Sequence, residues 1–254
     1  AARALELLIV ASSKTGNLDL IKSDLFPAVQ RGMREPSELV RAEYLRLLGR
    51  MVECCTEWIE INDMAALSVE GDEEASFFTN VLHIQHHRRL RALRRLAEEP
   101  KLKSHNVSRI FLPLLEQFIF DQAEGDAGRT LSDTTVITIG SLAKNLKWSD
   151  YRSVMKRYFG QLKKNPDQEK VVLRLISALV DGLTARMNNQ QDTAMTTDEQ
   201  EVSRTNRQRV IMDEFLPPLS EYLHRKDEST VDRRVTVAVS ITKLLRLLPE
   251  NEFI

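Results

Sequence analysis

A proline motif that recurs three times constrains the fold most strongly. Two apolar residues precede the proline, and another apolar residue stands two positions after it, in Leu25-Phe-Pro-Ala-Val, Phe111-Leu-Pro-Leu-Leu and Phe215-Leu-Pro-Pro-Leu. Each copy lies in a stretch with helical apolar spacing, where a proline removes one backbone donor and bends the helix. A kinked helix that recurs along the chain predicts an architecture of repeated units.

The rest of the chain also carries apolar residues at steps of three and four, which is typical of helices that bury one face. Strand-like alternation is nearly absent, and the β-branched stretch from Thr134 continues into a helix-like one. Only 9 glycines and 8 prolines interrupt the pattern. We therefore predict an all-α chain. The apolar series are Val40, Tyr44, Leu47, Leu48, Met51 and Val52; Leu90, Leu93, Leu96 and Ala97; Val171, Leu175, Leu179 and Leu183; and Val235, Val239, Thr242 and Leu245.

Two kinds of helix alternate along the sequence. One kind carries the proline kink, and the other carries an early arginine, as in Leu39-Val-Arg and Val231-Asp-Arg-Arg. Such pairs resemble HEAT repeats, in which neighbouring pairs stack because no single pair can bury its apolar face alone. We expect a HEAT/armadillo-like α-solenoid of stacked antiparallel helix pairs. About six pairs are expected, at 4–33, 38–82, 86–123, 130–165, 168–223 and from 229 onward.

Two features concern the extent of the domain. The chain begins without Met and in the middle of a helical pattern, so residues 1–254 are interpreted as a segment of a longer HEAT-repeat solenoid. Residues 187–203 are polar and lack an apolar stripe, which indicates a flexible insertion between two helices.

Composition excludes several classes of function. No run approaches the roughly 18 to 20 apolar residues that a spanning helix needs. The net charge of −1, from 36 basic and 37 acidic side chains, means that any electrostatic function must come from local patches. Cys54 and Cys55 are adjacent, which fits neither a structural disulfide nor a zinc pair and favours a reducing compartment, cytosol or nucleus. We find no catalytic motif and expect no enzyme and no cofactor.

The densest positive charge lies between His83 and His105, a segment that contains seven Lys or Arg residues and only two acidic residues. On a helix, Arg88, Arg91 and Arg95 fall within about 60° of one another, opposite Leu93, with Arg94 beside them. Arg89 lies nearer the core and is expected to pair with an acid of a neighbouring helix. The candidate RNA phosphate contacts are Arg88, Arg91, Arg94, Arg95, Lys101 and Lys103. A solvated face, or pairing with acidic loops such as Asp72-Glu73-Glu74, remains the alternative.

Three histidines, His83, His86 and His87, stand at helical spacing in the same segment. Two of them could share a helix face, but a zinc enzyme would need a third ligand and a base at a characteristic offset, and neither is present. We therefore expect no metal site and interpret His86 as a buried, hydrogen-bonded histidine.

A second, weaker basic patch is interleaved with Tyr151, Tyr158 and Phe159. Aromatic side chains can stack on bases, but at these spacings we interpret the three as core anchors. Contact with an RNA backbone is the better hypothesis for the cations. These are Arg152, Lys156, Arg157, Lys163 and Lys164.

The segment Phe77-Phe-Thr-Asn-Val-Leu-His-Ile-Gln-His-His-Arg-Arg-Leu-Arg-Ala-Leu-Arg-Arg-Leu-Ala resembles one motif of a known family. The family is that of the very large HEAT-repeat component twenty of the small-subunit processome, also called the "down-regulated in metastasis" family. The match is specific over about twenty residues and covers a fraction of such a protein. It implies a non-catalytic nucleolar scaffold that contacts precursor ribosomal RNA, small nucleolar RNA and other processome proteins, with no membrane and no small-molecule substrate.

Other classes of HEAT-repeat protein remain alternatives on the sequence. A nuclear transport receptor would be expected to carry acidic inner helices, whereas the densest cluster here is arginine. A regulatory scaffold for a phosphatase or kinase is the other alternative.

Overall fold

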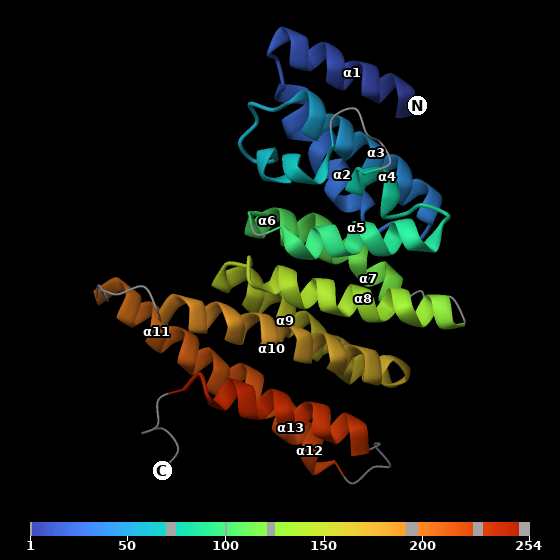
Figure 1. The fold of residues 1–254 in the computed structure, drawn as a ribbon. Coiled ribbons are helices and arrows are strands. Elements are labelled where there is room, and N and C mark those ends of the chain that lie inside the picture. Colours follow the sequence, from blue (N-terminus) through green and yellow to red (C-terminus); the bar gives the residue numbers. More distant parts are fainter. Residues whose placement is uncertain are drawn as a thin grey trace. The chain divides into compact units, whose positions relative to one another are not determined.

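The computed structural model describes residues 2–69, 75–99, 101–120, 125–191, 198–225 and 231–248. Over these residues the chain forms helices and turns and no strand (Figure 1), so the predicted all-α class is confirmed. The α-helices are α1 (Ala2–Thr15), α2 (Phe26–Gly32), α3 (Glu38–Cys54), α4 (Phe77–Asn80), α5 (His86–Glu98), α6 (Ser104–Asn106), α7 (Leu112–Phe120), α8 (Asp126–Ala143), α9 (Trp148–Lys164), α10 (Glu169–Gln191), α11 (Asp198–Val210), α12 (Leu216–His224) and α13 (Val231–Leu245). The shorter turns are η1 (Ile21–Leu25), η2 (Asn62–Leu67), η3 (Val107–Phe111), η4 (Pro166–Gln168) and η5 (Ile211–Phe215).

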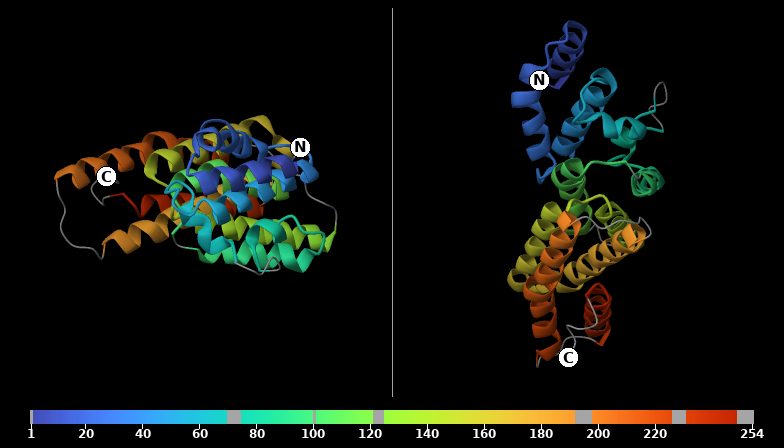
Figure 2. Two further views of the ribbon diagram at one scale, coloured as in Figure 1. Left: turned by 90° about the horizontal axis from the view of Figure 1, so that it is seen from above. Right: turned by 90° about the vertical axis from the view of Figure 1, so that its left-hand side faces the viewer.

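The chain consists of two compact units, and the boundary between them falls within α8, between Thr138 and Ile139. In the first unit, α3 packs against α1 and α2, and α4 packs against α3 and α5. In the second unit, α10 packs against α9 and α13, and α13 also packs against α12. Figure 2 shows from two further sides that each unit consists of helices joined by turns. This pairwise helix packing fits the predicted solenoid of helix pairs.

The proline of each motif copy is preceded by one π-helical turn. These turns are η1, η3 and η5, and the proline follows two residues after each of them. In an α-helix, the ring of Pro27 would clash with the carbonyl four residues earlier, at Ser23. Ser23 is the middle residue of η1, and the same relation holds for Pro113 with η3 and Pro217 with η5. The wider turn accommodates the proline, and its recurrence at three equivalent places is structural support for the repeat.

The early arginines fasten the loop that leads out of a kinked helix. Arg41, at 2% exposure, donates from Nη1 to the carbonyl oxygens of Glu35 (2.5 Å) and Pro36 (2.8 Å). Arg234, at the start of α13, donates to the Arg225 carbonyl at 3.0 Å, at the end of α12. These bonds satisfy backbone carbonyl groups of the loop after α2 and of the residue that ends α12. Each arginine therefore ties its own helix to the kinked helix that precedes it.

Two of the helix pairs expected on the sequence differ from the observed packing. The expected pair 4–33 would join α1 to α2, but α1 packs chiefly against α3. Likewise 168–223 would join α10 to α12, whereas α10 packs against α9 and α13. The pairs supported by packing are α2 with α3, α9 with α10, and α12 with α13. Like helices of successive pairs then stack, as α10 does on α13.

The expected insertion at 187–203 lies where α10 ends and α11 begins. The backbone is helical up to Gln191 and again from Asp198. Residues 192–197 of that insertion lie outside the described residues.

Aromatic side chains anchor the core of each unit. In the first unit, Phe77 packs edge-on against Phe111 with ring centroids 5.7 Å apart. In the second, Tyr151, Tyr158 and Phe159 are buried on α9, which confirms their interpretation as core anchors. A small-residue seam lies beside them, where Gly182 of α10 approaches Gly140 and Ala143 near the end of α8.

Candidate RNA-binding surface

The arginine-rich segment forms helix α5, and one face of this helix is buried. Ala92, Leu93 and Leu96 are buried, and the Leu93 carbonyl accepts a bond from the Thr138 hydroxyl at 3.3 Å. Just before the helix, His83 Nδ1 accepts the backbone N–H of Gln85 at 3.0 Å. The apolar stripe predicted at steps of three and four thus fixes which side of α5 faces out.

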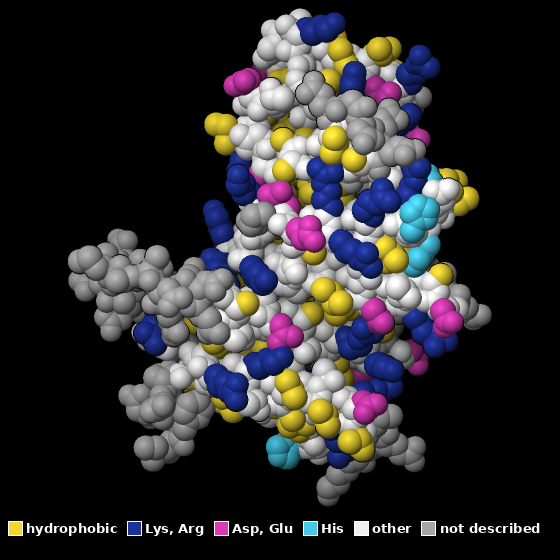
Figure 3. Space-filling view, viewed as in Figure 1, with side chains coloured by type: hydrophobic (Ala, Val, Ile, Leu, Met, Phe, Trp, Pro, Cys, Tyr) yellow, Lys and Arg dark blue, Asp and Glu magenta, His cyan; other side chains and the backbone are white. Residues whose placement is uncertain are grey.

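The outward side presents His87, Arg91 and Arg94, which we call the α5 stripe. All three side chains are exposed, and Arg91 and Arg94 form no ion pair with any described residue. Figure 3 shows Lys and Arg side chains gathered around α5, with His side chains beside them. Ile84, in the turn before the helix, is 90% exposed and adds one apolar side chain to the surface. Two unpaired cations on one helix face repel each other mildly, so an anionic partner is favourable there.

Two of the predicted phosphate contacts are engaged inside the protein. Arg95 donates from Nη1 to the Ala75 carbonyl at 2.5 Å and from Nη2 to the Ala66 carbonyl. Lys103 donates from its backbone N–H to Asp63 Oδ2 at 2.7 Å, and from Nζ to the Ile59 carbonyl and Asn62 Oδ1. Both side chains fasten loops of the first unit, so the structure does not place them with the α5 stripe.

The remaining two predicted phosphate contacts, Arg88 and Lys101, differ in their exposure to solvent. Arg88 is half-buried, and Lys101 is exposed in the turn after α5, where its backbone N–H binds Glu99 Oε1 at 3.1 Å. The acidic residues Asp72, Glu73 and Glu74, considered as internal partners, lie outside the described residues.

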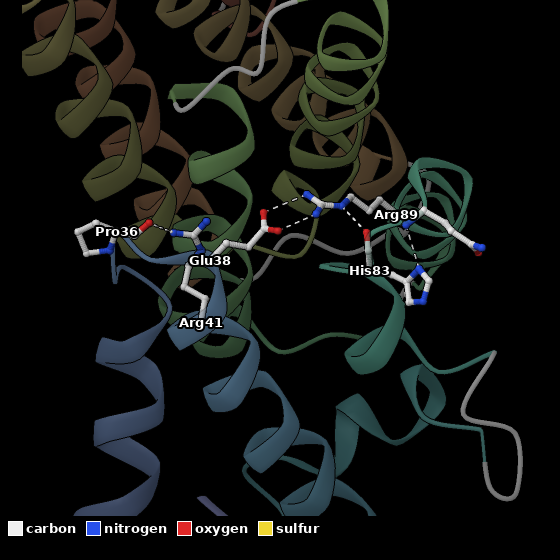
Figure 4. Close-up of polar contacts among 6 residues, drawn as sticks. Pro36, Glu38, Arg41, His83 and Arg89 are labelled. Atoms are coloured by element: carbon white, nitrogen blue, oxygen red, sulfur yellow. Dashed lines mark hydrogen bonds and ion pairs between the residues drawn. The ribbon is translucent and has the colours of Figure 1, made fainter.

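Arg89 occupies the inner position expected for it. Its guanidinium makes two bonds to Glu38 of α3, at 3.0 Å and 2.6 Å, and its Nε donates to the His83 carbonyl at 2.6 Å (Figure 4). The guanidinium also lies 6.0 Å from the centre of the Phe118 ring. The prediction of an acidic partner from a neighbouring helix is confirmed.

The histidines do not assemble a ligand set. His86 is half-buried, and its Nε2 is buried without a hydrogen-bond partner among the described residues, so the expected hydrogen-bonded core histidine is not observed. Within the described parts of the chain, no three His, Cys, Asp or Glu side chains are grouped so as to hold a metal ion. No described helix is both long enough and apolar enough to cross a membrane.

The second basic patch is largely neutralised by acids of η5 and α12. Arg152 makes two bonds to Glu214, one of them 2.7 Å from Nε, and Lys156 lies 3.2 Å from the same carboxylate. Lys163 lies 3.7 Å from Glu221. The bond from Arg152, assisted by Lys156, lowers the pKa of Glu214 to about 2. This cluster joins α9 to the kinked helix and leaves little net charge for an RNA backbone.

The other two cations of this patch are not paired to Glu214 or Glu221. Arg157 is half-buried, with its guanidinium 5.4 Å from the centre of the Tyr158 ring. Lys164 is exposed at the end of α9.

A third group of cations was not anticipated from the sequence. Arg186 of α10 and Arg207 of α11 line one small cavity in the second unit. They are separated by the polar stretch 187–203, so no local motif brings them together. The only signal in the sequence is the run Arg204, Arg207 and Arg209 on a helix that otherwise lacks an apolar stripe.

These features define an all-helical repeat protein with an exposed cationic helix face. No family model matches the chain. It is 38% identical over 263 residues to U3 small nucleolar RNA-associated protein 20 of Schizosaccharomyces pombe, covering 96% of this chain and 10% of that protein. It is 33% identical over 240 residues to the protein of the same name from Saccharomyces cerevisiae, covering 93% and 10%. The chain thus spans about a tenth of the length of these curated relatives. Both are homologues over nearly the whole chain, which confirms the resemblance to that family.

Proposed function

We propose that this chain is part of a non-catalytic scaffold of the small-subunit processome. In this role it supports the assembly and processing of precursor small-subunit ribosomal RNA in the nucleolus. The observation that carries the proposal is the 38% identity to a protein whose name associates it with U3 small nucleolar RNA. Stacked helix pairs suit a scaffold because they offer an extended surface to several partners.

The proposed partners are precursor ribosomal RNA, small nucleolar RNA or both, together with other processome proteins. The α5 stripe is the proposed RNA contact, because Arg91 and Arg94 are exposed cations without a counterion among the described residues. Binding of such groups to phosphates releases counterions and does not depend on base sequence. Arg88 and Lys101 are proposed as flanking contacts. Lys164 is the proposed contact of the second patch, since its neighbours Arg152, Lys156 and Lys163 pair with acids.

Recovery of the tagged full-length protein from cells tests this function. The proposal predicts that precursor small-subunit ribosomal RNA and U3 RNA co-purify, and that nuclease treatment releases the RNA. Depletion of the protein is expected to accumulate unprocessed precursor. The proposal would be contradicted if the tagged protein co-purified with import cargo, or with a phosphatase or kinase, and with none of these RNAs. That result would favour another class of HEAT-repeat protein.

A further inference from the structure

A small cavity in the second unit is lined by cations and aromatic rings. Arg186, Arg207, Trp148 and Tyr151 contribute to its wall, and the lining contains no acidic side chain among the described residues. Its volume is about 20 Å³. That is room for one or two water-sized groups.

The two arginines line the same cavity, and neither forms an ion pair with a described residue. Arg186 donates one bond, from Nη1 to the Leu146 carbonyl. The Nε of Arg207 is buried and has no hydrogen-bond partner among the described residues. Burial lowers the pKa of Arg207, and the charges of Arg186 and Arg204 lower it further. Two guanidinium groups that are partly removed from water and repel each other are unfavourable unless an anion lies between them.

A second donor without a partner lines the same cavity. Tyr151 is 1% exposed, and its hydroxyl is buried without a hydrogen-bond partner among the described residues. Burial, assisted by the charge of Asp181, raises the pKa of Tyr151 well above its usual range, so the hydroxyl stays protonated and can donate. A buried polar group without a partner costs free energy, and two such groups beside the charged Arg186 at one cavity indicate a missing acceptor.

We propose that this cavity receives a phosphate oxygen of an RNA strand, held between the guanidinium groups of Arg186 and Arg207 with the Tyr151 hydroxyl as an additional donor. Planar guanidinium groups match the geometry of phosphate oxygens. The cavity is too small for a base, so the contact carries no sequence preference. Exposed Arg204, one turn before Arg207, is placed to meet an adjacent phosphate. The choice of RNA rather than an acidic peptide rests on the function proposed above.

A local crosslink and an affinity measurement test the site in the full-length protein. With a short RNA that contains 4-thiouridine, we expect crosslinks to map to Trp148 or Met187, which both line the cavity. Arg207→Gln is expected to abolish these crosslinks, weaken RNA binding by about tenfold and flatten the salt dependence by roughly 0.7 for one lost contact. Its melting temperature should be unchanged or higher, because one of two mutually repelling cations is removed.

Arg204→Gln, at an exposed position, should weaken RNA binding without any effect on folding.

The matched control is Arg209→Gln on the same helix. Arg209 is 81% exposed and pairs with Asp213 at 3.5 Å, so this change removes the same charge outside the cavity and should leave the crosslinks in place. Crosslinks that persist in Arg207→Gln, together with unchanged affinity and salt dependence, would overturn the proposal. So would an acidic peptide that competes as strongly as unlabelled RNA. If the crosslinks behave as expected but the protein recovers no precursor RNA from cells, the processome function fails and this site stands.

Discussion

Arg89 of α5 and Glu38 of α3 form a two-pronged ion pair, with nitrogen–oxygen distances of 3.0 Å and 2.6 Å. Arg89 is 16% exposed in its side chain, whereas Glu38 is 42% exposed. The same guanidinium holds the His83 carbonyl just before α5. One member of the arginine cluster therefore positions the helix whose outer face carries Arg91 and Arg94.

Replacing Arg89 is expected to affect stability rather than RNA binding alone. Arg89→Gln should lower the free energy of unfolding by about 1 to 2 kcal/mol, because a half-buried pair loses one partner while Glu38 remains hydrated. Urea unfolding measures the change. Arg91→Gln, on the exposed face of the same helix, is the control and should stay within about 0.5 kcal/mol of wild type. Equal effects of the two changes would refute the structural role of Arg89.

The apolar side of α5 should be more sensitive still. Leu93 is fully buried, so Leu93→Ala is expected to cost about 2 to 5 kcal/mol through the cavity that it leaves. RNA binding should then be lost only as the fold is lost, which circular dichroism and binding measured on one denaturant series would show. A stable Leu93→Ala protein that no longer binds RNA would place Leu93 in the contact surface instead.

Two helical glycines are expected to respond in opposite directions to alanine. A Cβ added at Gly182 would lie 2.5 Å from the Gly140 carbonyl oxygen and 2.6 Å from the Ala143 Cβ. Backbone atoms cannot move aside cheaply, so Gly182→Ala should destabilise the protein by about 1 to 3 kcal/mol. At Gly160, in α9, an added Cβ meets nothing within 4 Å. Gly160→Ala should therefore stabilise by about 0.5 to 1 kcal/mol. Melting temperatures that shift in the same direction would contradict the close seam at Gly182.

Acid should weaken the junction between α9 and η5. The pKa of Glu214 is held near 2 by Arg152 and Lys156, below its usual 4.5. A carboxyl whose pKa is lower in the folded state stabilises the fold at pH values above the unfolded pKa, and this contribution is lost as pH falls from about 4.5 to 2. Glu214→Gln should flatten the fall in melting temperature over that window. Glu221→Gln is the control, since Glu221 is 64% exposed and lies 3.7 Å from Lys163. Parallel pH curves for wild type and Glu214→Gln would contradict the role assigned to this carboxylate.

Much of the fold could be predicted because it follows from local chemistry. Apolar steps of three and four identify helices, and the proline motif marks the three kinked ones. The pairing of the helices could not be predicted in the same way. In a stack, each helix contacts neighbours on two sides, and the sequence order alone does not say which of them is its partner in a pair. The bond from Arg41 to the Glu35 and Pro36 carbonyls decides this, and it depends on a loop conformation.

The candidate surface was predictable to a similar degree. A helical wheel separates Arg89 from Arg91 correctly, because burial follows the helix period. It fails for Arg95, and it does not extend to Lys103, which follows α5; the acceptors of both side chains are mostly carbonyls of distant loops. It also cannot find Arg186 and Arg207, which come from two helices on either side of a polar stretch.

The most direct test of the account is the salt dependence of RNA binding by Arg91→Gln/Arg94→Gln in the full-length protein. The account predicts unchanged helix content and melting, weaker RNA affinity, and a salt slope flattened by up to roughly 0.7 to 0.9 per lost contact, without any change in sequence preference. A charge-matched control is Arg46→Gln/Arg50→Gln on α3, where both arginines are exposed but pair with glutamates, and it should bind RNA as wild type does. An Arg91→Gln/Arg94→Gln protein that folds and binds RNA with unaltered affinity and slope would contradict the assignment of the α5 stripe to RNA.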